Sequence, residues 1–178
     1  SSDLCSSLAF AYIGNKNGLD VLDFRGGESQ YIFSLNMNIK KVLEFPDVNG
    51  SITMVKKEIQ GTMELLNNLE LNKEYYLATG KHAAIVRKIE SGVEYLELQS
   101  KIQNGWMSFD KYGSMASTLN KRFGCRKTVD KSYGKIWEKP VILMDVDSFN
   151  GNTDFEQILG YINTVVDKQK KGVMGDVR

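Results

Sequence analysis

The sequence is poor in the residues that build disulfide frameworks and metal sites. It has 2 cysteines, 1 histidine and 2 prolines in 178 residues. Two cysteines are too few for a disulfide framework, and Cys5, Cys125 and His82 have no zinc-ligand spacing. The 2 prolines and 16 glycines also exclude a low-complexity or collagen-like chain. We therefore expect no metal site.

An excess of charge of one sign and a long apolar run are also missing. The 23 basic and 22 acidic residues leave a net charge of +1, which gives no electrostatic case for nucleic acid or an anionic membrane. No apolar run approaches the ~18 residues of a transmembrane helix. Residues 1–5 lack the basic and apolar regions of a signal peptide, so they read as a cut through a longer chain or a trimmed one. The oligomeric state stays open.

What remains is an ordinary globular composition, with 42% hydrophobic and 25% charged residues. The length suits one domain. We expect a single domain over residues 1–168 and a polar tail over residues 169–178.

Hydrophobic spacing predicts a helix first, then a mostly antiparallel sheet, then a closing helix, which is an α+β pattern. The region 100–140 reads as loop with short elements. The predicted helices span residues 4–13, 51–70 and 154–168, and the predicted strands span residues 19–24, 75–78, 82–89, 93–99 and 141–146. The run 14–18 is predicted to end the first helix.

The strands 82–89 and 93–99 form a predicted hairpin that carries the only histidine. Side chains alternate across a strand, so His82 shares a face with Glu97 and Gln99 whether the two-residue loop is 90–91 or 91–92. Cross-strand neighbours lie close enough for an imidazole to hydrogen-bond either side chain. We expect the opposite face to be the core. An ordinary histidine at a strand start explains His82 equally simply.

Cys5 falls at the predicted start of the first helix. Free N–H groups and the helix dipole favour a thiolate there, and an imidazolium nearby favours it further. Cys5, His82 and then Gln99 or Glu97 supply nucleophile, base and orienting group in chain order. The alternative for Cys5 is a small buried apolar residue. Cys125 reads as a structural or surface thiol.

Four short runs resemble the papain-fold toxin domains of bacterial polymorphic toxins and phage head proteins, a group that includes glutamine deamidases. They are Leu4-Cys5-Ser6-Ser7-Leu8-Ala9-Phe10-Ala11-Tyr12 with Gly18-Leu19-Asp20-Val21, then Gly80-Lys81-His82-Ala83-Ala84-Ile85-Val86, and Tyr95-Leu96-Glu97-Leu98-Gln99. The group's second motif cysteine is Leu8 here, and the residue before the nucleophile is Leu4 rather than Asn. The group's Asp-Pro-Gln corresponds to Glu97-Leu98-Gln99, so the third member is Gln99 or Glu97.

The resemblance implies a papain-like fold, with the nucleophile helix packed on the sheet, and a cysteine hydrolase that needs no cofactor. Its expected substrate is a protein, through deamidation of glutamine side chains or cleavage of peptide bonds. An immunity protein is a possible partner, and the setting is a secreted effector or a phage particle. Only four residues precede Cys5, so papain's upstream oxyanion glutamine is missing or supplied otherwise. This departure favours the alternative, a catalytically inactive papain-like scaffold that binds a protein.

Overall fold

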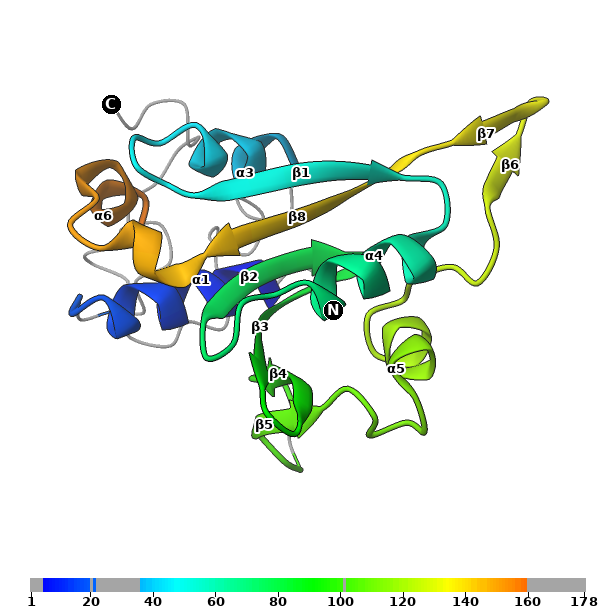
Figure 1. The fold of residues 1–178 in the computed structure, drawn as a ribbon. Helices are drawn as coiled ribbons and strands as arrows, with labels where there is room; N and C mark the ends of the chain where they lie inside the picture. The colour runs from blue at the N-terminus through cyan, green and yellow to red at the C-terminus, as the bar shows by residue number, and fades with distance from the viewer. Residues whose placement is uncertain (1–4, 20, 22–35, 101, 160–178) are drawn as a thin grey trace. The chain divides into compact units, whose positions relative to one another are not determined.

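The computed structural model describes residues 5–19, 21, 36–100 and 102–159 (Figure 1). The chain divides into two compact units, the first made of Ser1–Asn49 with Met144–Arg178 and the second of Gly50–Leu143. The prediction of a single domain over residues 1–168 stays a prediction, and the predicted tail lies outside the described residues. Within the described ranges, no helix has the length and apolar character needed to cross a membrane.

The described part of the first unit is mostly helical. It contains α1 (Cys5–Lys16), α3 (Asn36–Leu43), the short 3-10 helix η2 (Val146–Phe149) and α6 (Thr153–Leu159). Helix α1 packs on η2 and α6. Aromatic rings join these elements, because the Phe155 ring lies 6.2 Å from that of Phe10 and 4.6 Å from that of Phe149. All three rings are fully buried, so their packing stabilises the unit.

Helix α1 confirms the predicted first helix but does not end at Gly14. It continues to Lys16, and Gly18 follows with a φ of 84°. A Cβ at Gly14 would lie only 2.8 Å from Val21 Cγ2 and 2.9 Å from Leu159 Cδ1. Gly14 therefore serves close packing inside the helix rather than termination, and the turn after the helix falls at Gly18.

The second unit is built on a six-stranded sheet with the order β1-β8-β2-β3-β4-β5. The pairs β2–β3, β3–β4 and β4–β5 are antiparallel, so the predicted α+β class with a mostly antiparallel sheet is confirmed. The strands are β1 (Gly50–Val55), β2 (Glu74–Thr79), β3 (His82–Ile89), β4 (Gly92–Glu97), β5 (Gly105–Ser108) and β8 (Lys139–Asp145).

Two helices and a small hairpin complete this unit. Helices α4 (Glu58–Asn67) and α5 (Met115–Lys121) contact each other. Strands β6 (Asp130–Ser132) and β7 (Lys135–Trp137) form a separate two-stranded sheet that stands away from the larger one in Figure 1.

The predicted helix over residues 51–70 is wrong in its first part. Residues 50–55 form strand β1 at the edge of the sheet, and the helix begins only at Glu58. Ile52 and Val55 have helical spacing with Ile59, but β-branched side chains favour a strand. Ile52 and Met54 remain exposed on this edge strand, so the apolar spacing there does not mark a buried helix face.

The other predicted elements agree better with the structure. Strand β3 has the predicted bounds, and β2 and β8 overlap their predictions closely. Helix α6 confirms the start of the closing helix, whose remainder from residue 160 lies outside the described residues. Residues 19 and 21 are not in a strand, and the rest of the predicted strand 19–24 lies outside the described residues.

Candidate functional site

Cys5 is the first residue of α1, as predicted. The helix has 12 residues and no acidic side chain in its first turn, so no carboxylate there opposes a negative charge on sulfur. The side chain is 6% exposed and belongs to the buried part of the first unit. Its local setting combines a helix N-terminus with burial from solvent.

His82 opens strand β3 in the second unit, where it pairs with Thr79 of β2. Its ring lies edge-on to Phe123, with the ring centroids 5.0 Å apart and the planes at 69°. Burial, helped by the positive charge of Arg122, lowers the pKa of His82 to about 3, so the imidazole is neutral at neutral pH. Among the described residues, no hydrogen bond to this ring is found.

The hairpin register agrees with one of the two predicted alternatives. The pairs Val86–Tyr95 and Ile89–Gly92 place the loop at residues 90–91, the register in which His82 and Gln99 would face each other if the ladder continued. Strand β4 ends at Glu97, however, and Gln99 follows it as a half-buried residue. The pairing of β3 with β4 therefore ends before it reaches His82 and Gln99.

Glu97 is held by a residue that sequence reasoning missed. Arg122 donates from Nε to Oε1 of Glu97 at 3.1 Å and from Nη2 to Oε2 at 2.8 Å. Both carboxylate oxygens are thus engaged in a fork-like pair, with side-chain exposures of 21% for Arg122 and 10% for Glu97. No local pattern signals this pair, because 25 residues separate its members.

The prediction that the His82 face of the hairpin lies away from the core is wrong. Ala84, Val86 and Tyr95 on this face belong to the core cluster of the second unit. The Tyr95 ring packs on Phe109 and Phe123, at 5.2 and 5.6 Å between centroids. The opposite face is buried as well, at Ile85 and Leu96. Alternation assigns residues to faces, but only packing decides which faces meet solvent.

Cys125 is a buried structural thiol. It is 1% exposed, and its sulfur lies 3.5 Å from Oγ1 of Thr79, which is 2.8 Å from the Thr62 hydroxyl. Burial raises the pKa of the Cys125 thiol to about 11, so it stays protonated at neutral pH and is a poor nucleophile. Across the described residues, no group of three or more His, Cys, Asp or Glu side chains is arranged to hold a metal ion.

The four predicted site residues are divided between the two units. Cys5 belongs to the first unit, whereas His82, Glu97 and Gln99 belong to the second. Within the second unit, His82 is the first residue of β3 and Glu97 is the last residue of β4. Phe123 packs against His82, and Arg122 binds Glu97.

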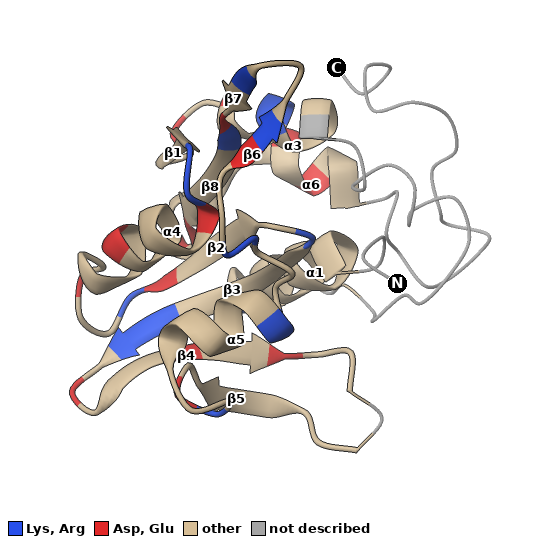
Figure 2. Cartoon of the chain, turned by 90° about the vertical axis from the view of Figure 1, so that its right-hand side faces the viewer, with Lys and Arg blue, Asp and Glu red and all other residues tan. Residues whose placement is uncertain are grey.

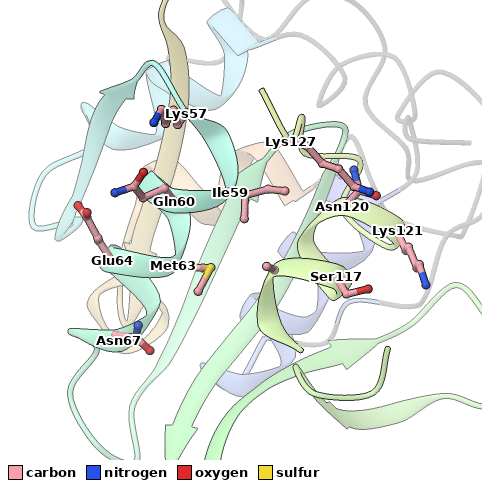
Figure 3. Close-up of a pocket in the computed structure, with 11 residues that line it drawn as sticks. Lys57, Ile59, Gln60, Met63, Glu64, Asn67, Ser117, Asn120, Lys121 and Lys127 are labelled. Carbon is pink, nitrogen blue, oxygen red and sulfur yellow. The ribbon is translucent and has the colours of Figure 1, made fainter. Parts of the chain in front are cut away.

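A groove in the second unit lies outside this set of residues. It runs between α4 and α5 and has a volume of about 680 Å³ (Figure 3). Sequence reasoning did not find it, because α5 lies in the region 100–140, which reads as loop with short elements that are not individually placed. Its lining residues are Lys57, Ile59, Gln60, Met63, Glu64, Asn67, Ala116, Ser117, Asn120, Lys121 and Lys127.

Comparison with known proteins adds no relative to this description. No protein family, curated protein or solved structure matches the chain. Functional inference therefore depends on the residues themselves and on their surroundings.

Proposed function

We propose that the chain is a papain-like cysteine hydrolase that acts on a protein, with Cys5 as the nucleophile and His82 as the base. The observation that carries the proposal is the place of Cys5 at the start of a 12-residue helix without an acidic residue in its first turn. Backbone N–H groups at such a start stabilise a thiolate and the oxyanion that forms during acyl transfer. His82 opens a strand of the following antiparallel sheet.

The proposed reaction is acyl transfer to sulfur followed by hydrolysis. His82 takes the thiol proton, and the sulfur of Cys5 attacks the carbonyl carbon of the substrate. The C–N bond breaks, and the proton on His82 goes to the departing nitrogen. Water then cleaves the thioester and returns the proton to sulfur. A glutamine side chain would yield glutamate and ammonia, and a peptide bond would yield two chains.

Gln99 is the better candidate to orient His82. Both carboxylate oxygens of Glu97 are bound by Arg122, so Glu97 has less capacity left for the imidazole. Gln99 lies two residues beyond the end of β4, and the proposal requires its side chain to reach His82. Because the pKa of His82 is lowered to about 3, the proposal requires the negative charge of the thiolate to raise it during the reaction.

A second function is favoured by the surroundings of His82. This ring is 9% exposed, neutral and packed edge-on against the core residue Phe123. Those are the properties of a structural histidine. They support the alternative of a catalytically inactive scaffold that binds a protein partner.

Alkylation of the native protein separates the two functions. Iodoacetamide labelling from about pH 5 to about pH 9, a range that brackets an ordinary thiol pKa, is followed by mass spectrometry of each cysteine. The hydrolase predicts that Cys5 labels below neutral pH and that His82→Gln removes this low-pH reactivity. Cys125, buried and with a raised pKa, serves as the internal control and should stay unlabelled in both proteins.

The opposite result would support the scaffold. If Cys5 titrates as an ordinary thiol, or labels only on unfolding, and His82→Gln changes neither, no thiolate–imidazolium pair exists. Release of ammonia from a glutamine-containing protein, measured beside peptide cleavage, then distinguishes deamidation from proteolysis for an enzyme that passes the first test.

A further inference from the structure

The groove between α4 and α5 has an apolar floor. Ile59 and Met63 come from α4 and are half-buried against the core cluster of the second unit, and Ala116 contributes from α5. In Figure 3, Ile59 and Met63 point toward α5 across the groove. A volume of about 680 Å³ accommodates several apolar side chains.

The rim of the groove carries excess positive charge. Lys57, Lys121 and Lys127 line it, and Glu64 is its single acidic lining residue. All three lysines are exposed, and none forms an ion pair with another residue in the described ranges. Figure 2 shows the end of α5 in blue, and it shows acidic residues in red on α4. These cations are available to a bound anionic group.

We propose that this groove binds an acidic amphipathic helix of a protein partner. Two packed helices leave a groove that a third helix can fill with its apolar side chains. The flexible thioether of Met63 adapts to such side chains. Glutamate or aspartate residues flanking the apolar stripe would meet Lys57 on one wall and Lys121 and Lys127 on the other.

The arrangement of the lysines favours an extended ligand over a small anion. They come from the start of α4, the end of α5 and the loop after it, and they surround an apolar floor as exposed residues. Protein interfaces combine an apolar centre with a polar rim in this way. None of Cys5, His82, Glu97 and Gln99 lines the groove, so the inference is independent of the thiol chemistry.

The probe is a fluorescein-labelled synthetic peptide of about 18 residues, long enough to form a helix, with leucines at helical spacing and glutamates beside them. Fluorescence anisotropy measures its binding to the whole chain. Two control peptides replace every glutamate by lysine or scramble the leucine spacing. Two double variants of the chain are compared. One carries Lys121→Glu and Lys127→Glu at the groove. The other carries Lys131→Glu and Lys135→Glu on the β6–β7 hairpin and changes the net charge by the same amount.

We expect saturable binding of the acidic peptide only. Reversal of the two groove lysines should weaken it by about tenfold, and the hairpin reversal by much less, because a local charge pair outweighs the screened field of distant charges. Met63→Lys, in a variant whose circular dichroism is unchanged, should abolish binding. Equal weakening by both reversals, equal binding of the lysine peptide, or no saturable binding would overturn the proposal. A concentration-dependent dimer that Met63→Lys disperses would overturn it in favour of a second copy of the chain.

Discussion

Two hairpins of the second unit use the same local signal and end in different surroundings. The β2–β3 turn has Gly80 with a φ of 59°, and the β6–β7 turn has Gly134 with a φ of 71°. At the first turn, Lys81 donates its backbone N–H to the Phe123 carbonyl at 2.7 Å. At the second turn, Tyr133 is 96% exposed. A glycine turn signals a hairpin, but it does not reveal whether the hairpin is enclosed.

Two sets of ion pairs near these hairpins also differ in how far solvent reaches them. Glu97 and Arg122 form a largely buried two-point pair. Asp130, at the start of β6, contacts Arg126 at 3.2 Å and Lys139 at 2.7 Å, but those two cations are 50% and 39% exposed. Solvent screens the second set, so the same chemistry should contribute less to stability there.

The largest expected effect is the difference between alanine substitutions at the two turn glycines, Gly80 and Gly134. A Cβ at Gly80 would lie 2.5 Å from the Phe123 carbonyl oxygen and 2.8 Å from the Cys125 nitrogen, whereas one at Gly134 meets nothing within 4 Å. We expect Gly80→Ala to lower the free energy of unfolding by about 2–4 kcal/mol, from backbone strain plus overlap. Gly134→Ala should cost only about 1 kcal/mol, from the positive φ alone. Urea unfolding of both variants measures the difference, and equal losses would remove the contrast between the hairpins.

A smaller effect is expected for the ion pairs. Arg122→Ala leaves the Glu97 carboxylate buried without its partner, which should cost about 2–3 kcal/mol. Arg126→Ala should give no resolvable change, because its partner Asp130 keeps Lys139 and solvent. A double variant, Arg122→Met with Glu97→Leu, replaces both charges by apolar side chains and should recover most of the lost free energy of unfolding. If Arg122→Ala is as mild as Arg126→Ala in chemical denaturation, the Glu97 pair is screened as well.

The smallest expected effect, counted per pH unit, is a pH dependence that belongs to His82. Its folded pKa, about 3, lies below the usual histidine pKa of 6.5, so the unfolded chain binds a proton between these pH values and the folded chain does not. Stability is therefore complete above pH 6.5 and falls as the pH decreases from there toward 3, by about 1 kcal/mol per pH unit. Asp130, whose pKa is lowered mainly by the Lys139 hydrogen bond, loses its contribution to stability only as the pH falls below about its usual pKa of 3.8.

Comparison with His82→Gln isolates this contribution. Unfolding free energies of the two proteins, measured from about pH 7 to about pH 5, should diverge as the pH falls, with the wild type losing stability faster. Parallel curves would show that His82 does not titrate between these values, and that the ring is hydrated or paired in solution.

Local patterns identified the parts of this chain that depend on neighbours in sequence. Alternating apolar residues and a Gly80 turn suffice for β2 and β3, and the start of α1 at Cys5 follows from its apolar spacing. Ile52 and Val55 misled the prediction, because their spacing suits a helix while their branched side chains pair as an edge strand. Helix α5 was missed because its 7 residues are too few for a clear period.

The candidate site shows the same division. Sequence alone supplied Cys5 at a helix start and His82 and Glu97 on one face of a hairpin, because periodicity determines element and face, whereas Gln99 lies beyond the end of β4. Only the tertiary structure decided that this face is enclosed by Phe123, that Arg122 binds Glu97, and that α4 and α5 form a groove rimmed by lysines. Burial, ion pairing and grooves depend on which distant residues meet, and no local pattern contains that information.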